Sequence, residues 1–167
     1  MRKTPKLPVL IALLTVALTR FSLAEDWKGE ASSKQLSMSA MAGVGVVDGM
    51  AGPGLVATFA KKIVHKGFAP EINNQVHLEG AFGPTFIRGE TPLLYSAHLR
   101  WDFQKDLNWT LYAVGGLGGV ILPSAMGGGV ELFPRFGIGI YLYLRDEISL
   151  RAELSHEFSG AGVSFHL

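Results

Sequence analysis

The sequence predicts an all-β protein, a closed antiparallel transmembrane β-barrel of about eight strands preceded by a cleavable signal peptide. Three observations support this prediction. Apolar and polar residues alternate with a period of two along most of the chain, which is typical of strands with two unlike faces. Only 17% of the residues are charged and 21 of the 167 are glycine, so charge is low for a soluble domain. The N-terminus has the features of an export signal.

The first 24 residues are interpreted as a secretory signal peptide. Three basic residues within the first six positions precede an uncharged, mostly apolar run at 7–19. Ser22-Leu23-Ala24 then offers small residues at the usual cleavage spacing. Arg20 ends the apolar run well short of the roughly 20 residues that a spanning helix needs. Cleavage is therefore favoured over an uncleaved membrane anchor.

The remaining chain divides into a flexible leader at 25–35 and a barrel at 36–167. From Glu25 onward there are 11 Lys and Arg against 14 Asp and Glu, a net charge of −3. Nucleic-acid binding would need a clustered basic face, so no nucleic-acid partner is expected. The chain has no cysteine, which excludes disulfides, thiolate metal sites and a cysteine nucleophile.

The first half of the barrel segment contains four expected strands. They are placed at 36–46, at 55 to about 66, at 72 to about 86, and at 93–103. Asp48-Gly49 closes the first of them, and Gly52-Pro53-Gly54 is a second strong turn signal that follows directly. Both signals are therefore expected to lie in the connection between the first two strands.

The second half begins with the turn 104–108 and a glycine-rich strand at 109–121. A long irregular segment is expected at 122–135, within which 130–133 leaves open a further short strand. Three strands with strict alternation end the chain. Their turns are expected at Arg145-Asp146-Glu147 and at Phe158-Ser159-Gly160.

The strand at 93–103 decides which face meets lipid. One face carries only leucine, alanine and aromatic residues, whereas the other carries His98, Arg100 and Asp102. An eight-stranded barrel has an interior just wide enough for side chains, so the charged face is assigned to the interior and the apolar face to lipid. The inverted register remains an alternative, namely a soluble periplasmic barrel that binds an apolar ligand.

A polar network is expected inside the barrel. Its members are His77, Glu79, His98, Arg100, Asp102, Tyr141, Tyr143, Arg151 and Glu153. Buried ions persist only when they are paired and hydrogen-bonded, so we interpret the set as structural salt bridges with tyrosine hydroxyls. A narrow ion path or small polar pocket is the functional alternative. No catalytic, cofactor-binding or metal-binding residues are predicted, and no cofactor is expected.

Aromatic side chains on the apolar face are expected to form two belts, one at each membrane interface. The candidates are Tyr95, Trp101, Phe103, Trp109, Phe136 and Phe165. If both chain ends are periplasmic, Trp101, Phe103, Trp109 and Phe165 gather at the periplasmic rim, and the other two gather toward the opposite rim.

Two segments carry a family resemblance. The run Gly137–Tyr141 with Arg145–Glu153 resembles the last hairpin of small opacity-type, OmpA-like outer-membrane β-barrel proteins of Gram-negative bacteria. The ending Gly162, Phe165 and Leu167 is similar to their C-terminal assembly signal, although that family usually ends in an aromatic residue. The resemblance implies a barrel in the cell outer membrane, inserted by the barrel-assembly machinery. Its surroundings would be outer-membrane lipid and lipopolysaccharide, and the barrel would be monomeric.

The function expected from these features is structural or surface-interactive, without catalysis. A lipid A-modifying, deacylase-like enzyme is the alternative, because His156, Glu157 and Ser159 lie near the expected outer end of a strand. A nucleophile needs its base within hydrogen-bond reach, and the spacing is not the His-x-Ser of those enzymes. An unchanged lipid A profile after substitution of His156 or Ser159 would remove this alternative.

Overall fold

The computed structural model describes residues 33–69 and 72–167, so the expected signal peptide and most of the leader lie outside the described residues. Eight strands and one short 3₁₀ helix, η1 (Ser124–Met126), follow one another. The strands are β1 (Leu36–Val47), β2 (Met50–Val64), β3 (Asn74–Pro84), β4 (Leu93–Gln104), β5 (Trp109–Leu122), β6 (Gly129–Arg145), β7 (Ile148–Ser155) and β8 (Phe158–His166). In the described part of the chain, no helix combines the length and the apolar character needed to cross a membrane.

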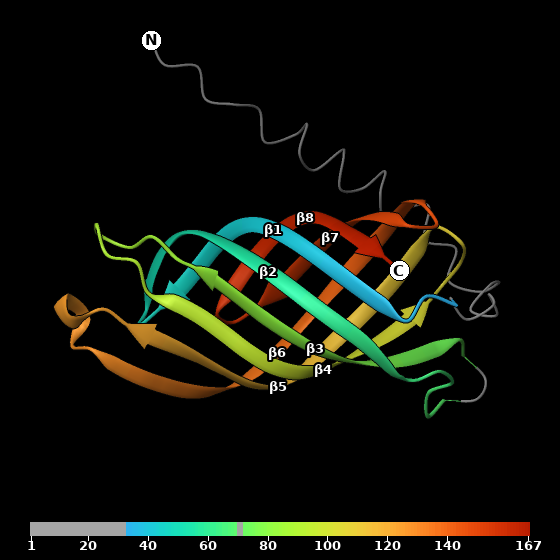
Figure 1. Ribbon diagram of the computed structural model, residues 1–167, viewed down its shortest axis with the longest axis horizontal. Coiled ribbons are helices and arrows are strands. Elements are labelled where there is room, and N and C mark those ends of the chain that lie inside the picture. The colour runs from blue at the N-terminus through green and yellow to red at the C-terminus, as the bar shows by residue number, and fades with distance from the viewer. Residues whose placement is uncertain (1–32, 70–71) are drawn as a thin grey trace, which may run out of the picture.

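Each strand pairs antiparallel with the next, and β8 returns to pair with β1, so the sheet closes on itself (Figure 1). Met38 lies opposite Phe165 in the closing pair. The Leu167 N–H donates to the Leu36 carbonyl over 2.9 Å, and this bond extends the closure to the last residue. The prediction of a closed antiparallel barrel of about eight strands is confirmed.

Along the strands, polar side chains are buried and apolar side chains are exposed, the reverse of the pattern in a soluble barrel. In β4, the polar Ser96, His98 and Arg100 are buried, whereas Ala97 and Leu99 between them are exposed. Closure gives every strand a hydrogen-bonded neighbour on both sides through the middle of the barrel. A bilayer tolerates only such structures, because lipid cannot hydrogen-bond the backbone.

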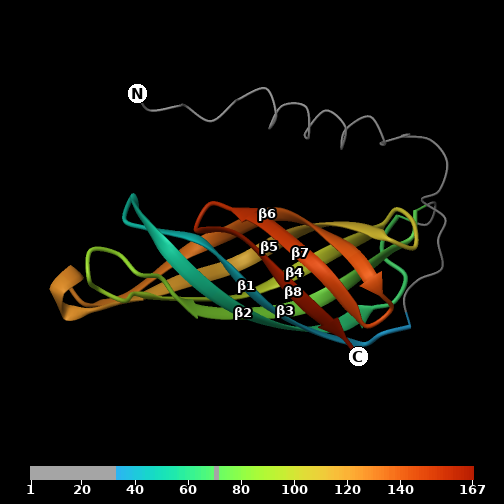
Figure 2. The ribbon, with the colours of Figure 1, turned by 90° about the horizontal axis from the view of Figure 1, so that it is seen from above.

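The two ends of the barrel differ. The terminal end carries the start of β1, the end of β8 and the connections 65–73, 105–108 and 146–147. The hairpin end carries the other four connections, and its rim is uneven. Figure 2 shows the β5–β6 hairpin reaching well beyond the β7–β8 turn. Accordingly, β7 pairs with β6 only as far as Gly137 opposite Ser155.

The expected turn at Gly52-Pro53-Gly54 is wrong, because these residues lie inside β2. Asp48 and Gly49 alone make the hairpin, both with positive φ (52° and 71°), as a two-residue turn with right-handed strand twist requires. Pro53 pairs with Val44. Its carbonyl accepts a hydrogen bond from the Phe86 N–H of the β3–β4 connection over 2.7 Å.

The irregular segment expected at 122–135 is shorter than predicted. β5 extends to Leu122 and β6 begins at Gly129, so 130–133 belongs to β6 and is not an additional strand. Pro134 misled the sequence interpretation, since proline cannot donate to a central strand. It lies opposite Leu117 of β5, beyond the last β7 pair, where β6 has a single neighbour.

The last turn falls at His156-Glu157, two residues before the predicted position. Ser155 closes it, since its hydroxyl donates to the Phe158 carbonyl over 2.8 Å and accepts from the Phe158 N–H over 3.2 Å. Phe158 is thereby the first residue of β8, with its side chain inside the barrel. The predicted turn at 145–147 is confirmed, because β6 ends at Arg145 and β7 begins at Ile148.

Candidate functional site

The barrel interior holds equal numbers of acidic and basic side chains. Among the described residues, those buried are Lys62, Arg100, Arg135 and Arg151 on the basic side and Glu79, Asp102, Glu153 and Glu157 on the acidic side. Buried ions are stable only when paired, and this interior is balanced when its histidines are neutral.

Glu79 of β3 is the centre of the network. Its carboxylate accepts hydrogen bonds from both terminal nitrogens of Arg151, at 2.6 and 3.1 Å, and from Nη1 of Arg100. Nε2 of His98 lies 3.2 Å from the same carboxylate. The Glu79 side chain has no solvent exposure, so these partners replace its hydration completely.

Arg100 of β4 connects this centre to the terminal end. It donates two hydrogen bonds to the Asp102 carboxylate, from Nε to Oδ1 over 2.7 Å and from Nη2 to Oδ2 over 3.1 Å. Its Nη1 also donates to the Tyr141 hydroxyl over 2.8 Å, and its guanidinium lies 5.2 Å from that ring. Two-point pairs of this kind hold an arginine in one orientation.

Arg151 of β7 connects the centre across the barrel. Its Nε donates to the Tyr112 hydroxyl over 2.8 Å, and its Nη1 donates to Thr58 over 2.9 Å and to Ser39 over 3.1 Å. Nη2 donates to Glu153 over 2.6 Å. One side chain therefore ties β7 to β1, β2, β3 and β5.

The network continues toward the hairpin end through Arg135, which pairs with both Glu153 and Glu157. Sequence reasoning missed Arg135 because it fell in the segment expected to be irregular. It also missed Lys62, whose strand alternates less clearly, and His166, whose ring lies 2.8 Å from the Ser149 hydroxyl. In β6, β2 and β8, every second residue points into the barrel. Counting from the inward residues of each strand could have identified all three.

The other predicted interior residues lie at the terminal end of the network. His77 is buried, with Nδ1 3.3 Å from Asp102. Tyr143 is only half-buried, and its ring centroid lies 4.9 Å from that of His166. All nine predicted interior residues thus point inward, and only Tyr143 retains substantial exposure.

An apolar plug fills the lumen at the hairpin end, and sequence reasoning did not foresee it. Its buried members are Met41, Val47, Val56, Ala81, Ile87, Leu94, Val120, Leu122 and Phe158. Between the plug and the ionic network lies a cavity of about 10 Å³, next to Arg135 and Glu157. A cavity of that size holds about one water molecule. The interior is therefore packed in two layers, one ionic and one apolar.

The six predicted belt residues all lie on the outward face. Trp101 and Phe103 are neighbours near the terminal end, with ring centroids 4.9 Å apart. Phe68 of the β2–β3 connection packs edge-on against Trp101 at 6.0 Å, a contact that alternation within strands could not reveal. Tyr95 and Phe136 lie toward the hairpin end, where the outward Phe82 pairs with Tyr95.

The three residues of the expected assembly signal lie along the closing strand. Phe165 is exposed on the outward face. A side chain at Gly162 would approach the Ala40 carbonyl to 1.9 Å, so only glycine allows β8 to lie this close to β1. Leu167 is exposed, and its carbonyl accepts bonds from the N–H groups of Gln35 and Leu36.

The alternative enzyme residues do not form a catalytic arrangement. His156 is half-exposed at the β7–β8 turn, and its Nδ1 lies 3.0 Å from the buried Glu157. Ser159 sits in the β8 ladder opposite Val44 and Leu154. Within the described residues, no hydrogen bond joins His156 to Ser159, and the Ser155 hydroxyl is engaged by Phe158.

The closed eight-stranded sheet, the apolar exterior and the ion-filled interior define the class of this protein, a β-barrel of the outer-membrane type. Two solved structures that it resembles are of Gram-negative outer-membrane barrels. The first is the N-terminal β-barrel domain of Pseudomonas aeruginosa OprF, with a TM-score of 0.58 and 15% identity over 81% of this chain and 100% of that one.

The second is Ail, the attachment invasion locus protein of Yersinia pestis, with a TM-score of 0.51 and 13% identity over 79% of this chain and 97% of that one. These likenesses establish the fold. No protein-family model matches the chain, and no curated protein matches it significantly in sequence.

Proposed function

We propose that the protein is a structural, non-catalytic barrel in the outer membrane of a Gram-negative bacterium, where it contributes to envelope integrity. The packed lumen carries this proposal. Arg100, Arg151 and Glu79 fill one layer of the interior, and the apolar plug around Phe158 fills the next. A barrel sealed in this way adds a rigid, closed element to the bilayer.

Surface contact with a host or matrix is the less favoured version. The four hairpin-end connections are 48–49, 85–92, 123–128 and 156–157. None of these connections is long enough to present a large folded loop. Residues 129–135 of the segment expected to be the longest loop, 122–135, belong to β6. Val130 and Leu132 on the β5–β6 hairpin are among the exposed apolar side chains at this end.

The packed lumen predicts that the barrel does not conduct. The purified full-length protein, inserted into a planar lipid bilayer, should give no steady single-channel current in potassium chloride, because an eight-stranded barrel leaves no aqueous channel. A porin inserted into the same bilayers serves as the control. Reproducible unitary steps from protein that shows heat-modifiable gel migration would contradict the structural proposal.

We further propose that Gly162, Phe165 and Leu167 form the signal read by the barrel-assembly machinery. Deletion of Leu167 should reduce the amount of assembled barrel in cells several-fold, since it removes the last backbone pair to β1 together with the terminal apolar side chain. Leu167→Phe should retain or improve assembly. Comparable heat-modifiable bands from the deletion variant and the intact chain in outer-membrane fractions would disprove the assignment.

A further inference from the structure

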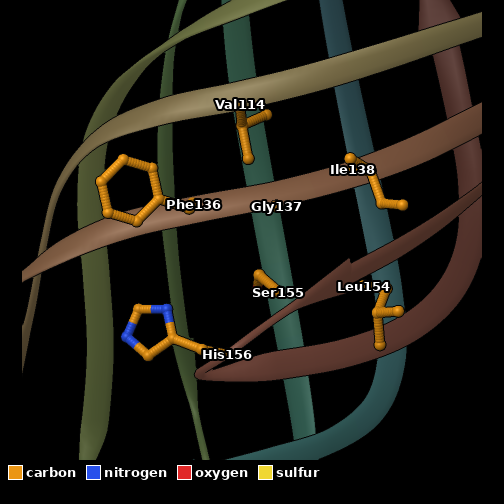
Figure 3. Close-up of a pocket in the computed structure, with 7 residues that line it drawn as sticks. All are labelled: Val114, Phe136, Gly137, Ile138, Leu154, Ser155 and His156. Atoms are coloured by element: carbon orange, nitrogen blue, oxygen red, sulfur yellow. The ribbon is translucent and has the colours of Figure 1, made fainter.

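A lipid-facing groove follows the seam between β6 and β7. Its hairpin-end part has a volume of about 490 Å³ and is bounded by Phe136, Ile138, Leu154 and His156, which Figure 3 shows around Gly137 and Ser155. A second hollow of about 480 Å³ lies nearer the terminal end. Its walls are Ile140, Leu142, Leu150 and Val163, and its floor includes Ala152 and Ala161.

The two hollows follow one another along the seam and share no lining residue. Consecutive outward pairs along the seam are Ile138 with Leu154, Ile140 with Ala152, and Leu142 with Leu150. Ala152 also lies opposite Ala161 of β8. The surface dips there because two methyl side chains are surrounded by much larger ones. Outward apolar side chains therefore line the seam from one hollow to the other, and this strip is called the apolar track.

The track ends in a polar group at the hairpin end. Beyond the last β6–β7 pair, the His156 side chain remains half-exposed, and its ring lies edge-on to that of Phe133 at a centroid distance of 5.2 Å. With Phe136 it borders the hairpin-end hollow (Figure 3). Its Nδ1 faces the Glu157 carboxylate at 3.0 Å, and Arg135 binds the other oxygen of that carboxylate. Nδ1 faces this buried ion pair, so the imidazolium form of His156, which carries a hydrogen on both ring nitrogens, has its Nε2–H left to donate to a ligand at the membrane surface.

We propose that this groove binds one phospholipid, with its head group at the hairpin end. An acyl chain lies along the apolar track, and the phosphate accepts a hydrogen bond from His156. This inference rests on the membrane location in the proposed function. It deepens that function by naming a lipid that the barrel retains.

The charges favour a single-phosphate lipid over multiply phosphorylated lipid A. Among the described residues, Arg88 is the one exposed Lys or Arg at the hairpin end, where Asp48, Glu90 and Glu131 are acidic. Several phosphates would require clustered cations, whereas one phosphate needs only one donor. A track of apolar residues that ends in one donor matches an amphiphile with a single head group.

The groove is tested by filling it. The full-length barrel in mild detergent would be mixed with palmitoyl-oleoyl phosphatidylglycerol and examined by native mass spectrometry for retained lipid. Ala152→Phe should lower retention at least tenfold, because the ring occupies the floor. Ala97→Phe, on the outward face of β4 away from the groove, is the matched control and should retain lipid as the natural chain does.

The head-group contact is tested separately at the exposed turn, where folding is less at risk. The natural chain should prefer phosphatidylglycerol over the corresponding diacylglycerol, which lacks phosphate. His156→Ala should reduce that preference about tenfold, as expected for loss of one charge-assisted hydrogen bond. An unchanged preference would overturn the role of His156.

Two outcomes would overturn the site as a whole. One is equal lipid retention by Ala152→Phe and Ala97→Phe when both show heat-modifiable migration. The other is retention of purified lipid A in preference to phosphatidylglycerol. Neither outcome affects the structural proposal, which depends on the absence of conductance and not on lipid retention.

Discussion

Replacement of Glu79 by alanine is expected to lower the free energy of unfolding by about 3–5 kcal/mol, the usual loss when one partner of a buried ion pair is removed. Arg100 and Arg151 share this carboxylate, and both guanidinium groups are almost completely buried. Without it, two buried cations remain close together and lose the carboxylate that they share. Urea unfolding of the barrel in lipid vesicles, followed by the heat-modifiable band, would measure the loss.

Glu79→Gln and Glu147→Ala are the informative controls. Glutamine keeps the size of the side chain but removes the charge, so most of the loss should persist. Glu147 lies exposed in the β6–β7 turn and has only a 3.8 Å contact with Lys34, so its removal should cost less than about 1 kcal/mol. A loss below that level for Glu79→Ala would show that the network is not a source of stability.

Replacement of Phe158 by alanine is expected to cost about 3–5 kcal/mol, the range for truncating a buried aromatic residue. Phe158 is 1% exposed and is a member of the apolar plug. Its removal would leave a cavity that neighbouring strands, bound in a closed ladder, cannot close. The same urea titration would detect the change as a lower midpoint with an unchanged slope.

Phe82→Ala separates plug packing from simple loss of apolar surface. Phe82 is 53% exposed on the outward face of β3, where lipid can occupy the space that the ring leaves. Its truncation should cost well under half as much as that of Phe158. Equal losses at the two positions would mean that the plug is loosely packed, and the expectation of a sealed lumen would then fail with it.

The contrast between the two faces of each strand made much of the fold predictable. In β4, one face carries His98, Arg100 and Asp102 and the other carries none of the charges, so the interior could be assigned without coordinates. The alternation of polar and apolar residues also predicted that Arg151 and Glu153 lie on the inward face of β7. Local alternation is sufficient for these assignments because side chains of a strand point to its two faces in turn.

The errors arose where local signals compete with long-range pairing. Pro53 and Pro134 predict breaks, yet both lie in strands, because at each of these positions the strand has a ladder neighbour on one side only. The turn after β7 was misplaced because the burial of Phe158 and the bonds from Ser155 decide it. Each of these depends on contacts with other strands, which no local pattern contains.

The sequence alone determined that the chain forms about eight antiparallel strands with an apolar exterior and a charged interior. Only the tertiary structure decided which interior charges meet. Closure and strand tilt bring Glu79 of β3 within 2.6 Å of Arg151 of β7, although 72 residues separate them. The tertiary structure also decided that β7 ends early and leaves the lipid-facing groove beside β6. Register across a closed sheet is a property of all eight strands together, and therefore no single strand encodes it.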